Sequence, residues 1–134
     1  MRLRLPFRYR IGFAALVLLL AACGGQSPPE LTQTTNGITA TLALTPDPPV
    51  PMDTTTLTLT LEDADGQPLT AADVAFDLTM PAMPMPVNRP AATETEDGVY
   101  EAEAIFTMAG AWRIQVDVTG LGTSATFAFD LKTK

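Results

Sequence analysis

Hydrophobic and polar residues alternate along most of the chain after residue 37. Residues 57–61, for example, read Leu-Thr-Leu-Thr-Leu. A period of two places apolar side chains on one face of an extended strand and polar side chains on the other. The same alternation marks six segments, at residues 38–44, 54–62, 74–80, 100–106, 112–118 and 125–131. None of this part has a helical repeat of useful length, so the pattern predicts an all-β domain.

Turn signals separate these segments, and Asp97-Gly98 is typical of a tight connection between antiparallel strands. A seventh, weaker strand is predicted within residues 87–95. Pro90 restricts it to a sheet edge, because proline cannot donate a ladder hydrogen bond. Seven short strands with turns between them predict an antiparallel sandwich of immunoglobulin-like topology. We expect its core to centre on five aromatic residues, Phe76, Tyr100, Trp112, Phe127 and Phe129.

The N-terminal segment has a different character. Four arginines within the first ten residues precede an apolar run at residues 11–22, which is the order of a secretory signal peptide. The run is shorter than the roughly 20 apolar residues that a membrane-spanning helix needs. It ends in Leu20-Ala21-Ala22-Cys23, which resembles the bacterial lipoprotein signal. The resemblance implies cleavage before Cys23 and attachment of diacylglycerol to its thiol. The alternative is an ordinary secreted protein with a chance cysteine.

These features divide the chain into three predicted parts. Residues 1–22 are a lipoprotein signal peptide, residues 23–36 a lipidated N-terminus with a flexible tether, and residues 37–134 the sandwich domain. The tether consists of small and polar residues with prolines, and it shows no hydrophobic periodicity. We expect acyl chains on Cys23 to hold the protein on the extracytoplasmic face of the cell membrane or the outer membrane, since two chains suffice for stable anchoring.

The charge balance disfavours two classes of partner. Residues 23–134 carry all fifteen acidic residues of the chain against four basic ones, Arg89, Arg113, Lys132 and Lys134. Nucleic acid is not expected as a partner, because its binding needs Lys and Arg to neutralise phosphates. A basic patch that adheres to anionic lipid is disfavoured for the same reason. The acyl chains alone are expected to connect the protein to its membrane.

The residue types also argue against catalysis. The chain has no histidine, and lipidation would consume its only cysteine, so a triad or a thiol nucleophile is not available. The acidic residues are spread over strand faces and turns. Asp63-Ala-Asp65-Gly66 superficially resembles the start of a calcium loop, but Val74 stands where the bidentate glutamate belongs. An Asp-Gly turn explains this segment more simply. We therefore expect a binding protein rather than an enzyme.

The methionines are the candidate metal ligands of this chain. Met80, Met83 and Met85 stand among prolines, Met52 lies in the connection before the second strand, and Met108 follows the fifth. Because each strand of an antiparallel sandwich reverses direction, these three connections lie at one end of the domain, provided that the strand within 87–95 exists. We call this the methionine end, and we expect it to point away from the tether.

Thioether sulfur is a soft, uncharged ligand that prefers Cu(I) or Ag(I) to zinc, magnesium or calcium. The sequence therefore predicts a Cu(I) site formed by Met83, Met85 and Met108, with Met52 or Met80 as a further ligand. The prolines would order the loop before binding. Trp112 begins the strand after Met108, so its aromatic face is expected to flank the ion.

The alternative role of these methionines is structural. Met80 and Met108 continue the inward parity of their strands, so both would close the core, since methionine fills irregular gaps well. Met83 and Met85 would then form an apolar lid or a contact surface. Two hypotheses stay open: a protein that binds or delivers Cu(I), and a metal-free interaction module whose methionine end docks on a membrane-protein or copper-protein partner.

Two stretches carry a family resemblance. VAFDLTMPAMPMP at residues 74–86 and DGVYEAEAIFTMAGAWRIQVDV at 97–118 resemble the YtkA-like domain of bacterial exported proteins. The most recognisable parts are Met80-Pro-x-Met83, Gly98-x-Tyr100 and Met108-x-Gly110-x-Trp112. The family resembles, more distantly, FixH-type oxidase-assembly proteins and CopC-like copper carriers, which implies extracytoplasmic copper handling. Members often carry a histidine near the methionine run. Residues 85–88 have none, which weakens the case for Cu(II) and for high affinity.

Overall fold

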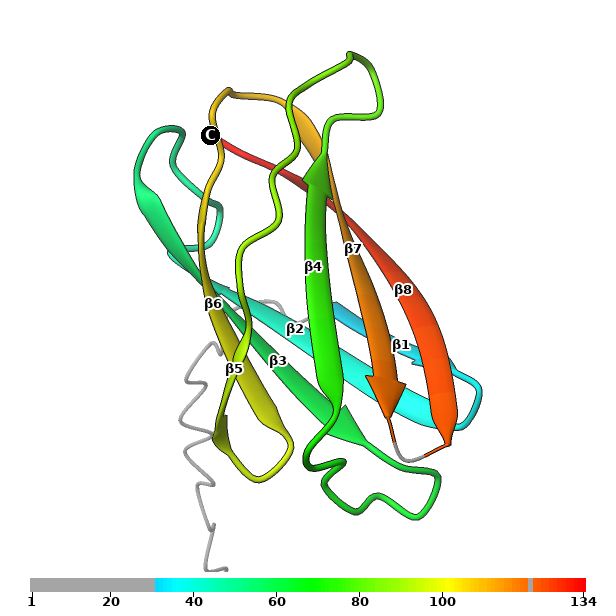
Figure 1. The fold of residues 1–134 in the computed structure, drawn as a ribbon. Coiled ribbons are helices and arrows are strands. Elements are labelled where there is room, and N and C mark those ends of the chain that lie inside the picture. Colours follow the sequence, from blue (N-terminus) through cyan, green and yellow to red (C-terminus); the bar gives the residue numbers. More distant parts are fainter. Residues whose placement is uncertain (1–30, 121) are drawn as a thin grey trace, which may run out of the picture.

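The computed structural model describes residues 31–120 and 122–134, which form eight β-strands in two antiparallel sheets (Figure 1). The larger sheet has the order β1-β2-β3-β6-β5, and the smaller one has the order β4-β7-β8. The strands are β1 (Leu31–Thr35), β2 (Ile38–Thr45), β3 (Thr54–Glu62), β4 (Asp73–Thr79), β5 (Thr93–Glu96), β6 (Val99–Ile105), β7 (Ala111–Gly120) and β8 (Thr123–Lys132). The predicted all-β antiparallel sandwich is confirmed. Within these residues, no helix is long and apolar enough to cross a membrane.

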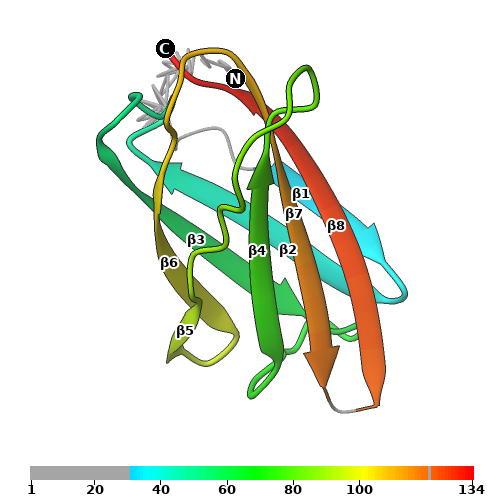
Figure 2. The ribbon, with the colours of Figure 1, turned by 45° about the horizontal axis from the view of Figure 1, so that its top comes forward.

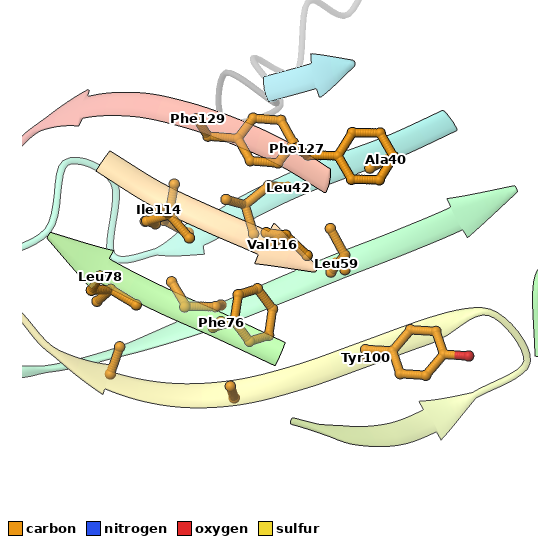
Figure 3. Packing of buried hydrophobic residues seen from close by; sticks show 14 of the residues in the cluster. Ala40, Leu42, Leu59, Phe76, Leu78, Tyr100, Ile114, Val116, Phe127 and Phe129 are labelled. Atoms are coloured by element: carbon orange, nitrogen blue, oxygen red, sulfur yellow. The ribbon is translucent and has the colours of Figure 1, made fainter. Parts of the chain in front are cut away.

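The core lies between the two sheets, where the period of two in each strand turns its apolar side chains inward (Figure 3). In β3 the three leucines are completely buried, whereas the threonines between them are only partly covered. All five aromatic residues that the sequence predicts for the core are buried, and Phe106 joins them. Phe106 packs edge-on against Trp112, with ring centroids 5.2 Å apart. Full burial of such side chains stabilises the fold by about 1.5–3 kcal/mol each.

Strand β1 corrects the predicted boundary and strand count. Residues 31–35 were assigned to the flexible tether of a seven-strand domain, but they pair with β2 along their whole length, from Leu31 opposite Leu42 to Thr35 opposite Ile38. The sequence LTQTT has no apolar alternation, so the pattern gave no sign of a strand. Strand β1 is held on one side by backbone pairing with β2. On its other side, the side chain of Gln33 forms hydrogen bonds with β8. The Gln33 amide donates to the Ala128 carbonyl of β8 and accepts from the Ala128 N–H at 3.3 Å.

Strand β1 also changes the point at which the chain enters the domain. Strand β2 runs toward the methionine end, so the antiparallel β1 runs away from it. The first described residue, Leu31, lies beside Leu42, three positions before β2 ends at Thr45. The same row of the sheet continues through Leu59 to Tyr100, near the start of β6, so the chain enters along the length of the larger sheet and not at the end where β2 begins. The signal peptide at 1–22 and the lipidation site Cys23 lie outside the described residues.

The weak strand predicted within residues 87–95 exists in a short form. It is β5, which is fully exposed and pairs only with β6 at the sheet edge. The segment before it follows β4, since the Leu78 N–H donates to the Asn88 carbonyl at 2.9 Å and Ala75 forms a bridge with Ala91. Because β5 reverses the chain, β6 runs toward the methionine end, as the grouping of the methionines requires.

Candidate functional site

Three connections and the C-terminus meet at the methionine end (Figures 1 and 2). The β2–β3 connection carries Met52, the β4–β5 connection carries Met80, Met83 and Met85, and the β6–β7 connection carries Met108. The strand directions thus bring all five predicted ligand residues to one end of the sandwich, although they come from segments far apart in the sequence.

Backbone hydrogen bonds tie these connections together. The Met52 N–H donates to the Phe106 carbonyl at 2.8 Å, which joins the first connection to the third. The Lys134 N–H donates to the Pro49 carbonyl at 3.1 Å, and the Thr133 N–H donates to the Gly110 carbonyl at 3.0 Å. The C-terminal residues therefore bridge two of the connections. Since these bonds fix the main chain, the methionine end is a braced surface rather than a set of independent loops.

The backbone of Met108 is the most firmly held. Its carbonyl accepts from the Trp112 indole N–H at 3.0 Å and from the Thr133 hydroxyl at 3.1 Å. Trp112 itself is only 1% exposed and packs on Phe106. The expectation that an open indole face flanks an ion is therefore wrong, because Trp112 begins the inward-facing series of β7. It positions Met108 through the main chain instead.

The second connection touches the third at one point. A Cβ placed on Gly110 would lie 3.1 Å from the terminal methyl of Met80, so this methyl packs directly against the β6–β7 turn. The Met83 N–H donates to the Met80 carbonyl at 3.2 Å, which closes the turn that carries Met83 outward. The two recognisable motifs, Met80-Pro-x-Met83 and Met108-x-Gly110-x-Trp112, therefore meet in space.

The five methionines divide into two groups by burial. Met80 is 8% exposed and belongs to the core. Met85 is partly buried against that core, and its sulfur accepts the Met80 N–H at 3.2 Å. The structural alternative thus holds for Met80. Met52, Met83 and Met108 are exposed, by 68%, 43% and 40%. Met108 departs from the predicted inward parity because β6 ends at Ile105, before the alternation reaches it.

The sequence analysis missed part of this surface. The large hydrophobic side chains that are exposed in the described residues are Met52, Met83, Val87, Ile105 and Met108, and all lie at the methionine end. We call these five the methionine surface. Val87 and Ile105 line a shallow hollow together with Met85 and Pro86. Ile105 had a detectable signal, since it occupies the outward position that Glu101 and Glu103 occupy earlier in the same strand.

Other metal chemistries have little support within residues 31–120 and 122–134. That part of the chain holds no group of three or more His, Cys, Asp or Glu residues that could bind a metal ion. Asp63, which the sequence placed in a turn, accepts the backbone N–H groups of Asp65 at 2.9 Å and Gln67 at 3.0 Å. This confirms the Asp-Gly turn, because the carboxylate closes its own loop. The thioethers remain the candidate ligands.

Comparison with known proteins identifies the fold. The sequence model of the YtkA-like family matches residues 32–117. The crystal structure of a DUF4426 family protein from Pseudomonas aeruginosa PAO1 is similar, with a TM-score of 0.56 and 10% identity over 77% of this chain and 93% of that one. A DUF4785 family protein from Legionella pneumophila subsp. pneumophila str. Philadelphia 1 has a TM-score of 0.54 and 16% identity, over 75% of this chain and 29% of that one. At these identities the likeness shows the fold alone. No curated protein sequence matches the chain.

Proposed function

The chain belongs to the YtkA-like family, and from this premise we propose that it is a lipid-anchored extracytoplasmic binding protein that holds one Cu(I) ion at its methionine end. One observation carries the proposal. Met83 and Met108 are exposed on two connections that pack together through Met80 and Gly110, and Met52 is exposed on a third connection bonded to the same region.

The chemistry of these side chains suits a soft monovalent ion. Thioethers carry no charge and prefer Cu(I), and three of them can coordinate it without histidine. The ligand set is narrower than the sequence predicted. Met80 is buried, and the Met85 sulfur already has a hydrogen-bond donor, so both support the site from within. A braced main chain lowers the entropy lost when the ligands are fixed around the ion.

A Cu(I) titration under reducing conditions tests the proposal. The protein should lack Cys23, because a free thiol would itself bind Cu(I). We expect saturation near one equivalent, and we expect Met83→Leu with Met108→Leu to weaken binding at least about tenfold, which corresponds to about 1.4 kcal/mol. Leucine keeps the volume and removes the sulfur, so stability should change little. Met80→Leu is the control for a buried methionine that supports the site without ligating the ion, and it should weaken binding much less than the double variant does. Unchanged binding by the double variant would show that the methionines are not ligands.

A metal-free interaction module is the second candidate function. Val87 and Ile105 favour it, because they extend the methionine surface with side chains that cannot bind a metal. Under this function, serine at both positions should abolish cross-linking of the protein to its partner in isolated membranes. The leucine double variant described above should keep that cross-linking, since it preserves the apolar surface.

A further inference from the structure

A short segment connects the domain to the proposed lipid anchor. Leu31 lies at the end of β1 that is nearer the methionine end, because β1 runs away from that end (Figure 1). Cys23 precedes Leu31 by eight residues. Eight residues span at most about 28 Å when fully extended. An anchor at Cys23 therefore holds the domain close to the membrane and leaves the methionine end within reach of the lipid.

Apolar exposure is confined to the same end. Every large hydrophobic side chain that is exposed in the described residues belongs to the methionine surface. Scattered exposed hydrophobic residues are ordinary, but their collection at one end of a small domain marks a surface that contacts something apolar. The transfer of methionine, valine and isoleucine side chains from water to the boundary between headgroups and acyl chains lowers the free energy.

The net charge differs between the two ends. All four basic side chains of the described residues lie in the half that ends in the methionine surface, where acidic side chains such as Asp47, Asp53, Asp77 and Asp130 offset them. Arg113 stands opposite the last residue of β4, Lys132 opposite the first residue of β7, Arg89 pairs with Asp77 at 3.1 Å, and the Lys134 N–H reaches Pro49. Among residues 31–120 and 122–134, the opposite end carries no lysine or arginine but seven acidic residues: Glu62, Asp63, Asp65, Asp73, Glu94, Glu96 and Asp97.

We infer that the methionine surface rests on the lipid surface of the membrane that carries the anchor, with the acidic end directed away from it. Anionic lipid repels the acidic end, whereas Lys132 and Lys134 near the apolar residues match the phosphates of the headgroups. This inference goes beyond the expectation that acyl chains alone connect the protein to its membrane. The inference does not depend on Cu(I), because Val87 and Ile105 belong to the surface and carry no sulfur.

Labels at the two ends of the domain test this orientation. The mature acylated protein is reconstituted into protein-free vesicles of phosphatidylethanolamine and phosphatidylglycerol. A new cysteine is introduced by Val87→Cys or, at the far end, by Gln67→Cys, and carries a fluorophore. Acylation blocks the thiol of Cys23. If the protein proves not to be acylated, a Cys23→Ser form with a histidine tag before residue 24, held on nickel-chelating lipid, supplies the anchor.

We expect a lipid-borne quencher to act severalfold more strongly on the label at residue 87 than on the label at residue 67, and a water-soluble quencher to show the reverse order. Met83→Leu with Met108→Leu should keep this difference, because it removes sulfur but not apolar area. Ile105→Ser with Met83→Ser should abolish it. Equal quenching at both ends would overturn the inference. A label at residue 87 that is shielded only in native membranes would also overturn it, and would show that a protein covers the surface.

Discussion

Single polar atoms of two buried aromatic residues secure the two ends of the sandwich. The Trp112 indole donates to the Met108 carbonyl at the methionine end. At the opposite end, the Tyr100 hydroxyl donates to the Leu69 carbonyl at 2.8 Å and accepts from the Ala72 N–H at 3.0 Å. Burial raises the pKa of Tyr100. Each ring fixes the backbone of a connection through a hydrogen bond from or to its polar atom, so the core helps to set the geometry of both connections.

Glu94 makes the opposite end sensitive to acid. Its carboxylate accepts the N–H groups of Ala71 at 3.2 Å and Gly98 at 3.2 Å, and the bond from Ala71 is the largest cause that lowers the pKa of Glu94. A lowered pKa in the folded state contributes stability above the ordinary pKa of glutamate, and this contribution disappears as the pH falls through the folded-state value. Glu94→Gln should therefore destabilise the protein at neutral pH but not at low pH.

Urea denaturation of the wild type and Glu94→Gln across this pH range measures the effect. Glu96→Gln is the control, since the neighbouring side chain is equally exposed and makes no such bonds in the described structure. The free-energy difference between wild type and Glu94→Gln should shrink as the pH falls below the ordinary range of glutamate. A difference that stays constant with pH would mean that the charge of Glu94 is not involved.

Gly110 is the residue on which the contact between the two motifs depends. Its φ of +136° lies in a region that favours glycine, and an added Cβ would press on Met80 at 3.1 Å. We expect Gly110→Ala to lower the free energy of unfolding by about 1–3 kcal/mol, from backbone strain and the displaced methyl. It should also weaken Cu(I) binding, because Met83 and Met108 would move apart.

Gly66→Ala is the matched control. Gly66 also has a positive φ, of +76°, but nothing lies within 4 Å of an added Cβ. Gly66→Ala should lower the free energy of unfolding through backbone strain alone, and it should leave Cu(I) binding unchanged. Equal effects of the two substitutions on stability and binding would show that the Met80 contact is unimportant.

At the scale of elements, the Gln33 side chain forms hydrogen bonds with the edge of β8 where a further strand of that sheet would otherwise pair. Strand β8 is the last strand of its sheet, and its open edge faces β1 of the other sheet. Gln33 donates to and accepts from Ala128 of β8, and the Asn36 amide donates to the Ser124 carbonyl at 3.0 Å. These side-chain amides form hydrogen bonds with backbone groups at the edge of β8 that could otherwise pair with another chain. Strand β1 therefore closes one side of the sandwich in spite of its polar sequence.

Gln33→Ala should expose the edge of β8, because it removes the side chain that bonds to Ala128. We expect a loss of about 0.5–1.5 kcal/mol in the free energy of unfolding for each hydrogen bond removed. We also expect a greater tendency to self-associate through the exposed edge of β8. Chemical denaturation and sedimentation velocity measure the two effects. Thr32→Ala, on the same strand, removes only a 3.4 Å contact with Thr41 and should change neither. A stable, monomeric Gln33→Ala protein would show that β8 needs no cover.

At the scale of the molecule, chemical character changes along the long axis. One end collects the methionine surface and the basic side chains, and the other collects acidic turns. The net charge of −7 does not describe this arrangement, because it belongs to the whole chain and includes the four arginines of its first ten residues. The Cu(I) proposal and the lipid inference both concern the first end, but they depend on different atoms of it: sulfur in one case, apolar area in the other.

The sequence by itself determined the local features. A period of two is set by the geometry of a strand, so the leucines of β3 and the aromatic core could be assigned without knowledge of their neighbours. The common end of the methionines also followed from the sequence, because it depends only on the number of strand reversals. Lipidation of Cys23 rests on an equally local motif and stays a prediction.

Only the tertiary structure decided the features that depend on distant partners. Strand β1 is held by β2 and by Ala128 of β8, so its own five residues gave no signal. Met80, Met83 and Met85 look alike in sequence, yet the core and a hydrogen bond separate them into buried and exposed residues. In a connection, where the period of two no longer applies, the burial of a side chain depends on which segments pack around it.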